Sequence, residues 1–450
     1  MATPQETIRI LRRVLAADAP SRAERLLARI HPADLGPVFS GLTPPEIRTV
    51  VDLLFEQRRA ATTLKELPAE MLPMVFEAIG DERLAQVIAR LELDDMVELV
   101  EWLPEDRRDA ILALLPEHKL AELRKAELYP AYSAGRVMTT RFLALHEEMT
   151  AQQAIDRIRE AGEEFEALFY LYVTDEKSHL RGVVPIRRLV AASAGRPCRE
   201  LMVEDPVSVR ADADQEEVAQ IVARYNLLAV PVVDADDRIL GVITVDDVID
   251  VITEEATEDM YHLAGLSEED RVFRPARESV RTRLPWMLLN LAATFVAAWV
   301  IGLFERTLEQ IVALAFFMPV VAGMGGNSGI QALTVITRAI ALGEIEFSSG
   351  LRAVGKEMSV AMAIGIVTGA VAGGLAYAWQ GSPYLGLVLF LTMMLTMAMA
   401  GVLGAAVPLI LKAVGQDPAV GSGVVVTTLV DIFGFFSFLG IGTLLIDRLL

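Results

Sequence analysis

The C-terminal part of the chain, residues 271–450, contains five apolar runs, and this feature limits the possible folds more than any other. A helix that crosses a lipid bilayer needs about 20 consecutive apolar residues. The sequence therefore predicts a transmembrane domain of five α-helical spans over residues 276–450. The runs are Leu284–Phe304, Ile311–Leu342, Val360–Trp379, Tyr384–Leu411 and Ala419–Ile446.

Charge is distributed unevenly between the two halves. Residues 1–270 hold 30 Lys and Arg against 52 Asp and Glu, whereas residues 271–450 hold 11 against 9. Such an acid excess argues against a nucleic-acid-binding protein, which needs basic residues to neutralise phosphates. A single cysteine, Cys198, excludes an intrachain disulfide and a multi-cysteine metal site. The N-terminus lacks an apolar signal core, so we expect the acidic half to stay in the cytoplasm.

The basic residues between the apolar runs predict the topology. Nine lie on the side of the N-terminus and two on the other, which predicts a multi-pass protein of the cell membrane with a cytoplasmic N-terminus and an external C-terminus. The nine are Arg271, Arg274, Arg277, Arg281, Arg283, Arg338, Arg352, Lys356 and Lys412, and the two are Arg306 and Arg448.

The first 130 residues show a repeat of twelve residues. An apolar residue followed by a turn recurs from Leu67-Pro68 to Leu115-Pro116, and acids suited to a helix N-terminus follow each turn. This spacing predicts short helices stacked in a superhelix, with the acids either capping the helices or forming a docking surface along one edge. The acids are Glu70, Glu82, Asp94, Asp95, Glu105 and Asp106.

Residues 137–252 contain an internal duplication. Each copy opens with a methionine, continues through a helix (Ala151–Ala161 or Gln215–Tyr225), and then has two apolar strands. The pattern resembles a tandem pair of cystathionine-β-synthase (CBS) domains, an α/β module that commonly binds adenosine nucleotides. In that family a Thr or Ser and an Asp after the second strand hold the ribose. By this resemblance Thr244 and Asp247 form one nucleotide site in the second copy, although they could equally form an N-cap pair. The first copy departs from the pattern with Pro185 and Arg188.

Acidic residues gather just before the first apolar run. Residues 131–270 hold 13 basic against 29 acidic residues, and from Asp247 the acids share one helical face. Like charges on one face destabilise a helix, and carboxylates are the ligands that hard divalent cations prefer. We therefore interpret this segment as a cation-responsive connecting helix, the alternative being a solvated acidic face. Its residues are Asp246, Asp247, Asp250, Glu254, Glu255, Glu258 and Asp259, and a second dense run contains Asp212, Asp214, Glu216 and Glu217.

Few polar residues lie within the apolar runs. Asp431 falls near the middle of the fifth run, where a charged aspartate costs at least about 2.5 kcal/mol. A water-filled path, a partner cation or protonation would relieve this cost, and the nearby Thr427 and Thr428 suit a path for hydrated ions. The second run has Pro319 and the glycine-rich stretch Gly323–Gln331, which we expect to break the helix and line a cavity.

Taken together, these features resemble the MgtE family of magnesium channels over essentially the whole chain. The stretches that carry the resemblance are Gly323–Gln331 (GMGGNSGIQ), Asp417-Pro418-Ala419 and Thr427–Asp431. The resemblance implies a homodimer with a pore on the two-fold axis, Asp431 as the selectivity residue, and Mg²⁺ bound between cytosolic carboxylates that keep the gate closed. The acids matching that role are Asp94, Asp95, Asp214, Glu216, Asp247, Asp250, Glu255, Glu258, Asp259 and Asp417, and we expect Gly325, Gly326, Asn327 and Thr428 to belong to the pore. Asn226 departs from the acid that some relatives carry.

The sequence thus predicts four segments: a helical N-domain at 1–130, a CBS pair at 131–252, a connecting helix at 253–275 and the pore domain at 276–450. The predicted function is Mg²⁺ uptake with feedback by cytosolic Mg²⁺, with a possible second ligand in ATP or another adenosine nucleotide. Two alternatives stay open: an alternating-access transporter of Co²⁺, Mn²⁺ or Zn²⁺, and a membrane-anchored nucleotide sensor. The transporter should show soft His or Cys ligands in its spans, which have none, and the sensor leaves Asp431 unexplained. No nucleophile elbow, P-loop or paired-histidine motif suggests an enzyme, and the five histidines are scattered through the acidic half.

Overall fold

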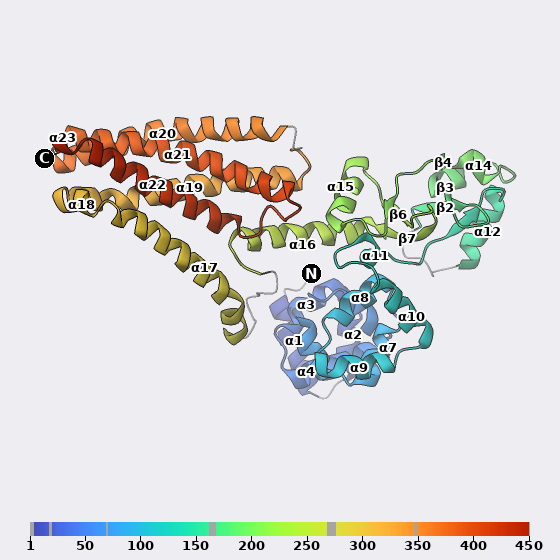
Figure 1. The fold of residues 1–450 in the computed structure, drawn as a ribbon. Helices are drawn as coiled ribbons and strands as arrows, with labels where there is room; N and C mark the ends of the chain where they lie inside the picture. Colours follow the sequence, from blue (N-terminus) through green and yellow to red (C-terminus); the bar gives the residue numbers. More distant parts are fainter. Residues whose placement is uncertain are drawn as a thin grey trace. The chain divides into compact units, whose positions relative to one another are not determined.

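The computed structural model describes residues 4–17, 20–68, 71–161, 168–267, 276–345 and 349–449. The chain forms two compact units, Met1–Ile252 and Thr253–Leu450, each of which is described by itself (Figure 1). Three residues used above for capping and topology, Glu70, Arg271 and Arg274, lie outside the described residues.

The first unit begins with a domain of short helices. Helices α7 to α10 begin at Asp81, Leu93, Glu105 and Glu117, which confirms the twelve-residue repeat in this stretch. No side chain caps these four helices, so the acids in their first turns act through the helix dipole rather than as N-caps. The elements are α1 (Pro4–Ala16), α2 (Pro20–Leu27), η1 (Pro32–Leu35), α3 (Gly36–Phe39), α4 (Pro44–Glu56), α5 (Ala60–Lys65), α6 (Leu72–Ala78), α7 (Asp81–Ile88), α8 (Leu93–Glu101), α9 (Glu105–Ala113) and α10 (Glu117–Ala126).

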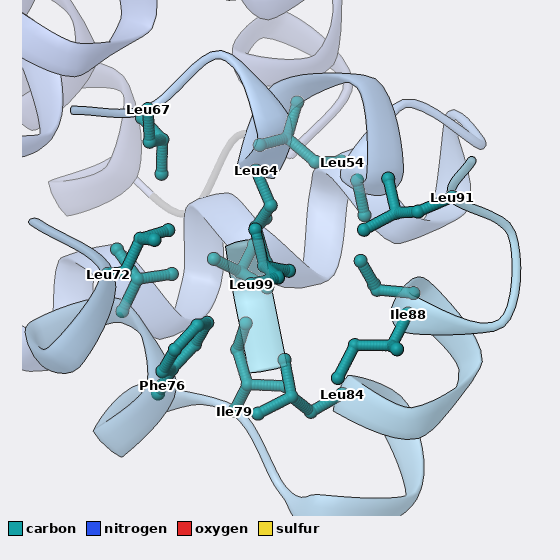
Figure 2. Packing of buried hydrophobic residues seen from close by; sticks show 14 of the residues in the cluster. Leu54, Leu64, Leu67, Leu72, Phe76, Ile79, Leu84, Ile88, Leu91 and Leu99 are labelled. Carbon is teal, nitrogen blue, oxygen red and sulfur yellow. The ribbon is translucent and has the colours of Figure 1, made fainter. Parts of the chain in front are cut away.

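Large apolar side chains from successive repeats fill the core of this helical domain. Figure 2 shows Leu64, Phe76, Leu84 and Leu99 pointing toward one another from α5, α6, α7 and α8. All four are buried. Because each short helix has too little apolar surface to be stable alone, stacking of neighbouring repeats supplies the stabilisation.

Basic side chains satisfy carbonyl groups at the helix C-termini of the same domain. Arg107 of α9 donates to the carbonyl oxygens of Phe76 (2.7 Å) and Ile79 (2.8 Å) after α6, and also to Asp81. Arg59 does the same for Leu27 (2.6 Å) and Ile30 (2.7 Å) after α2. The last carbonyls of a helix lack intrahelical partners and carry partial negative charge, so these cations connect one repeat to the next.

The CBS pair forms the rest of the first unit, and both copies have the predicted strands and helices. The first copy has a four-stranded sheet in the order β1-β2-β3-β4, and the second a three-stranded sheet in the order β5-β6-β7. In each sheet a parallel pair is followed by an antiparallel one. The elements are α11 (Ala134–Val137), β1 (Ala144–His146), α12 (Ala151–Ala161), β2 (Tyr170–Thr174), β3 (Leu180–Pro185), α13 (Ile186–Ala191), α14 (Cys198–Leu201), β4 (Val203–Glu204), β5 (Val209–Arg210), α15 (Gln215–Tyr225), β6 (Ala229–Val233) and β7 (Ile239–Thr244).

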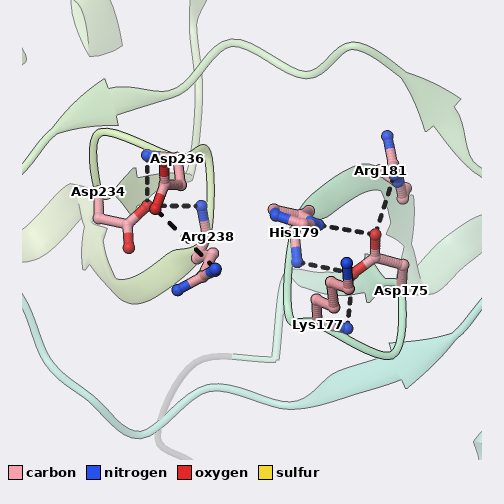
Figure 3. Close-up of polar contacts among 7 residues, drawn as sticks. All are labelled: Asp175, Lys177, His179, Arg181, Asp234, Asp236 and Arg238. Carbon is pink, nitrogen blue, oxygen red and sulfur yellow. Dashed lines mark hydrogen bonds and ion pairs between the residues drawn. The ribbon is translucent and has the colours of Figure 1, made fainter.

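The two copies meet through the equivalent turns β2–β3 and β6–β7 (Figure 3). Asp175 accepts hydrogen bonds from the backbone N–H groups of Lys177 (2.9 Å) and His179 (3.0 Å), and its other oxygen lies 2.8 Å from His179 Nδ1. Asp234 plays the same part in the second copy, where it accepts from the N–H groups of residues 236 and 238. These hydrogen bonds lower the pKa of both carboxyl groups. The aspartates that end the two strands therefore hold the turns.

Helix α16 (Val245–Leu263) follows β7, and the second unit then contains the five long apolar helices. They are α17 (Ala276–Gly302), α19 (Ala313–Ala341), α20 (Gly350–Gln380), α21 (Pro383–Ala413) and α22 (Ser422–Leu444), joined by the short α18 (Glu305–Gln310) and followed by α23 (Ile446–Leu449). All five are long and apolar enough to cross a bilayer. The predicted fold class is confirmed: a helical domain, an α/β CBS pair and five apolar helices.

The expected break in the second span is wrong, because α19 is one continuous helix through Pro319 and the glycine-rich stretch. Its glycines allow neighbouring backbones to approach instead. A Cβ on Gly404 of α21 would lie 2.5 Å from the carbonyl oxygen of Gly329 in α19, and one on Gly373 of α20 would lie 2.5 Å from that of Gly386 in α21. Lipid provides no hydrophobic driving force between membrane helices. Small residues at their contacts let the backbones come close enough for van der Waals packing to stabilise the bundle.

Candidate ion sites

Asp431 lies near the middle of α22 on a face that the rest of the unit leaves open. The opposite face is buried: Val426 and Val430 would touch a Cβ placed on Gly329 and Gly325 of α19. Thr427, Thr428 and Asp431 are only half-buried. Asp431 makes no hydrogen bond or ion pair with any residue in the described part of the chain. Its carboxylate is therefore available to an ion or to a second subunit.

Helix α19 has a polar face in the same unit. Asn327, Gln331 and Thr334 are exposed along one side of it. A Cβ on Gly326 would lie 3.9 Å from Thr427 Cγ2, so this face adjoins that of Asp431. Gly325 points the other way, where its Cβ position lies 2.8 Å from Thr396 and Val430. The structure therefore gives Gly325 a role in helix packing, and its place in the pore stays a prediction.

The first unit brings together two acids far apart in sequence, Asp94 of α8 and Asp247 of α16. Burial and the nearby charge of Asp247 raise the pKa of Asp94 well above its ordinary value. Burial, together with the charge of Asp246, raises the pKa of Asp247 to about 6. The Oδ1 atom of Asp94 is buried with no hydrogen-bond partner. Buried polar atoms in proteins are almost always satisfied, so this oxygen marks a position for a missing donor or cation.

Two further predicted acids adjoin this pair. Asp95, whose charge contributes to the raised pKa values of Asp94 and Asp247, lies 3.6 Å from Lys65 Nζ. Asp250 also belongs to α16, where desolvation and the charges of Asp246 and Glu66 raise its pKa. We call Asp94, Asp95, Asp247 and Asp250 the cytosolic acid cluster.

For Asp214 and Glu216 the structure shows a local contact with each other, at the start of α15. Asp214 is the N-cap of α15, where its Oδ1 accepts a hydrogen bond from the Glu216 N–H at 2.8 Å. The structure thus gives Asp214 a local capping function. A metal-binding function for these two residues stays a prediction.

The predicted ribose-binding pair also has a local role. Thr244 donates from Oγ1 (2.5 Å) and from its backbone N–H (3.2 Å) to the same Asp247 oxygen. This is the N-cap reading that the sequence left open. Asp247 therefore lies in the first turn of α16, close to Asp94, so a nucleotide and a cation would share it.

A second cluster lies within the other unit, where the end of α16 meets the residues before α22. His262 Nδ1 lies 2.9 Å from Asp417 Oδ2 and 3.6 Å from Glu258 Oε1. Burial and the charge of Asp417 raise the pKa of the neighbouring Asp259. Glu255 is half-buried one turn earlier in α16. We call Glu258, His262 and Asp417 the entrance cluster.

Two residues of the second unit were missed in the sequence. His262 lies four residues after Glu258, a spacing that alone is a weak signal, and its contact with Asp417 spans 155 residues. Glu357 is 5% exposed in α20 and lies 2.5 Å from Lys356 Nζ. It was missed because α20 begins ten residues before the apolar run that predicted it.

The donor atoms of the cytosolic acid cluster fit Mg²⁺. All of them are carboxylate oxygens, the ligand that Mg²⁺ prefers. Asp94 Oδ1 is buried without a hydrogen-bond partner, and the raised pKa values of Asp94 and Asp247 reflect burial beside other acids. A bound divalent cation would offset that negative charge.

Comparison with known proteins covers each part of the chain. The MgtE intracellular N domain matches residues 30–132, the CBS domain matches residues 134–195 and 198–254, and the divalent cation transporter family MgtE matches residues 318–441. The magnesium transporter MgtE of Thermus thermophilus is 33% identical over 436 residues, 96% of either chain. That of Bacillus subtilis is 33% identical over 384 residues, 85% of either chain.

Solved structures agree with these matches for the first half of the chain. The cytosolic domain of the Mg²⁺ channel MgtE in complex with ATP is 33% identical, with a TM-score of 0.51, and covers 54% of this chain and 98% of its own. The soluble part of a magnesium transporter is 27% identical, with a TM-score of 0.53, and covers 56% of this chain and 100% of its own.

The fold and these matches define a membrane transport protein with a cytosolic N-terminal domain, a CBS pair and five candidate spans. A relative that is one-third identical over nearly the full length decides the family. The chain belongs to the MgtE family of magnesium transporters.

Proposed function

We propose that this protein is a homodimeric Mg²⁺-selective channel for magnesium uptake. The observation that carries the proposal is the position of Asp431: mid-helix, half-buried and without a partner among the described residues. A carboxylate at that depth is costly unless a water-filled path or a cation relieves it. In the proposed arrangement the C-terminus lies outside the cell.

The polar face of α19 supports pairing of two chains around a pore. Asn327 and Gln331 are exposed on a helix that crosses the bilayer, and lipid cannot satisfy their amides. A two-fold axis beside α22 would bring together this face, Thr428 and Asp431 of both subunits. Two Asp431 carboxylates can accept hydrogen bonds from hydrated Mg²⁺ without removing its water, and such weak binding lets the ion leave.

Closure by cytosolic Mg²⁺ follows from the cytosolic acid cluster. Without a cation, Asp94 and Asp247 repel each other and disfavour contact between the helical domain and the start of α16. Bound Mg²⁺ offsets that repulsion and stabilises the arrangement that contains it, which is a population shift driven by differential affinity. The other acids in this role are Asp95, Asp250, Glu255, Glu258, Asp259 and Asp417, with Asp214 and Glu216 further along the CBS pair.

We also propose that an adenosine nucleotide such as ATP binds the second CBS copy. A related cytosolic domain was crystallised with ATP, and the resemblance to CBS domains gives Thr244 and Asp247 as the residues that would hold the ribose. In the first copy Arg188 instead contacts the carbonyl oxygen of Leu201. One nucleotide site in each chain is therefore proposed.

Ion uptake into liposomes that contain the purified protein tests this function. We expect Mg²⁺ flux that exceeds K⁺ flux, and Asp431→Ala should abolish it while leaving folding and dimerisation intact. Asp447→Ala is the matched control, since Asp447 is an exposed aspartate of the same unit in α23. Unchanged Mg²⁺ uptake in Asp431→Ala would overturn the pore assignment, and equal uptake of Co²⁺ and Mn²⁺ would favour a general divalent-cation transporter.

A further inference from the structure

The two N-terminal helices carry a basic surface in the otherwise acidic half of the chain. Residues 1–30 hold six arginines, no lysine and three acids, whereas residues 31–270 hold 24 basic against 49 acidic residues. The charge at the start of the helical domain is therefore opposite to the charge of everything that follows it up to the membrane helices. We call the six arginines the arginine surface: Arg9, Arg12 and Arg13 of α1, Arg22 and Arg25 of α2, and Arg29 in the turn after α2.

Packing of α1 and α2 turns the arginine surface outward. The two helices contact each other, and Leu11, Ala23 and Leu27 on their inner sides are fully buried in the core of the helical domain. The arginines recur at i, i+3 and i+4 in α1 and at i, i+3 and i+7 from Arg22, so each set lies on one side of its helix. All six are exposed.

Local structure explains only part of this clustering. Arg12 donates to the carbonyl oxygen of Gly41 (2.6 Å) and to the Glu46 carboxylate (3.3 Å). Arg13 and Arg25 lie in the last turns of their helices, where a cation suits the helix dipole. Apart from Arg12, the guanidinium groups of the arginine surface have no hydrogen bond or ion pair with a described residue. Like charges this close on a helix destabilise it, so the clustering has a cost that an anionic partner would remove.

The chemistry of the arginine surface fits phosphate groups beside an apolar layer. Arg9 and Arg12 line an open pocket of about 390 Å³ together with Gln5, Ile8 and Gly41. A guanidinium group has five N–H donors, so Arg12 keeps donors that its contacts with Gly41 and Glu46 do not use. The planar fork of arginine binds two phosphate oxygens at once.

An exposed apolar side chain lies among these cations. Ile10 of α1 is 43% exposed and comes between Arg9 and Arg12 in the sequence. Basic side chains together with an exposed apolar one are typical of helices that bind the surface of a bilayer, where the apolar group enters the boundary between headgroups and acyl chains. This combination favours a lipid surface over an acidic protein as the partner.

We propose that the arginine surface docks on the anionic phospholipid headgroups of the cytoplasmic leaflet. The chain is a membrane protein with a cytosolic N-terminal domain, so the headgroups and the arginine surface belong to one assembly and meet at high effective concentration. The cytoplasmic leaflet is negatively charged and attracts clustered arginines within a Debye length. The same field repels the acids of residues 31–270. Lipid charge therefore orients the helical domain, with α1 and α2 toward the membrane.

Energy transfer between the helical domain and the lipid surface tests this docking on the full-length protein. A donor dye is attached through Ala16→Cys, at an exposed residue that ends α1, and acceptor dyes are attached to lipid headgroups. Cys198 is fully buried and is the single native cysteine, so the donor reacts at the introduced one. Nanodiscs of phosphatidylcholine alone are compared with nanodiscs of phosphatidylcholine and phosphatidylglycerol mixed two to one. We expect transfer to be at least twofold higher in the anionic nanodiscs, and high salt to abolish this increase.

Two triple variants test the part of the arginine surface on and after α2. The variant Arg22→Gln, Arg25→Gln, Arg29→Gln should lose at least half of the increase. The lysine variant Arg22→Lys, Arg25→Lys, Arg29→Lys keeps the charge and should keep most of it. Thermal unfolding of both variants checks that the helical domain still folds. Equal losses in the two variants would contradict attraction by charge.

A matched control removes the same charge elsewhere on the helical domain. It is the triple variant Arg90→Gln, Arg124→Gln, Lys125→Gln, at three exposed residues on or next to α7 and α10, and it should keep the increase. An equal loss in this control would mean a response to net charge and would overturn a defined docking surface. Equal transfer in the two kinds of nanodisc would overturn the proposal outright. High transfer in phosphatidylcholine alone that survives high salt would overturn lipid as the partner, because a protein contact would then hold the domain.

Discussion

The cytosolic acid cluster and Asp431 are both candidate cation sites, yet the two regions arrange their carboxylates in opposite ways. In the first unit several acids from different elements converge, and burial raises the pKa values of Asp94 and Asp247. In the membrane unit Asp431 lies half-buried on α22 with no partner among the described residues. Under the proposed function, the cytosolic acid cluster would hold a cation through several direct ligands, whereas Asp431 would attract hydrated Mg²⁺ and let it leave.

Packing differs between the same two regions. The helical domain is filled by large side chains such as Phe76 and Leu84, and cations such as Arg107 satisfy its helix ends. The membrane helices also bury large side chains such as Phe317 and Phe438, but at Gly373 and Gly404 their backbones come into close contact. The hydrophobic effect stabilises the packing of the helical domain in water. In lipid that effect does not act between helices, so close backbone contacts must stabilise the packing of the membrane helices.

The strongest test of this comparison removes the charges of Asp94 and Asp247, two acids of the cytosolic acid cluster. Asp94→Asn combined with Asp247→Asn should leave uptake at low cytosolic Mg²⁺ unchanged and raise the Mg²⁺ concentration that halves it at least tenfold. The reason is that both amides keep the side-chain volume but lose the charge that binds the closing ion. Liposome flux at graded internal Mg²⁺ measures this, with Asp109→Asn in α9 as a control. A loss of uptake at low Mg²⁺ would mean that the cluster serves more than closure.

The same cluster predicts a pH dependence in Mg²⁺-free buffer. The pKa of Asp247 is raised to about 6 in the folded protein, so its contribution to stability is present at about pH 4 and is lost as the pH rises through 6. The full difference is up to about 3 kcal/mol. Thermal unfolding of the first unit should therefore occur at higher temperature at pH 5 than at pH 7, and Asp247→Asn should reduce that difference. Millimolar Mg²⁺ at pH 7 should restore the stability by binding the folded state, and matched K⁺ should not.

Packing in the membrane unit can be tested at Gly404. Gly404→Ala places a methyl group against the Gly329 carbonyl oxygen, and overpacking of this kind costs about 1–3 kcal/mol. We expect a lower unfolding temperature in detergent, with no change in the Mg²⁺ response of the first unit. Gly374→Ala is the control, since no atom lies within 4 Å of its Cβ position. Equal stability of the two variants would contradict the role assigned to close backbone contact.

The smallest effect is expected at the turns between the CBS copies. The hydrogen bonds from His179 and the backbone lower the pKa of Asp175, so its contribution to stability is present at neutral pH and is lost as the pH falls below about 4. This pH range lies below the range in which Asp247 titrates. The direction is also opposite, because stability is lost here as the pH falls, whereas at Asp247 it is lost as the pH rises. Asp175→Asn should lower the unfolding temperature slightly at pH 7, and by progressively less as the pH falls from about 4 toward the lowered pKa of Asp175. Asp236→Asn, at an exposed residue of the equivalent turn, provides the comparison.

Features encoded within a dozen or so residues could be predicted well. The repeat at α7 to α10 and the helices Ala151–Ala161 and Gln215–Tyr225 agree with the structure. Local periodicity decides such elements, because each must present one apolar face to its neighbours. The break expected at Gly323–Gln331 was wrong for a related reason: glycine was read as a local effect on the backbone, whereas here it acts between helices.

The sequence by itself determined the order of the parts, the acidity of the first half, the five apolar runs and the isolation of Asp431. Only the tertiary structure decided which acids meet. Asp94 faces Asp247, and His262 contacts Asp417 across 155 residues. Such pairs depend on how whole helices pack, since close approach at Gly423 is what brings the end of α16 to α22. The sequence shows that a residue is charged, but the packing of distant segments decides which partner that residue meets, and so what it can do.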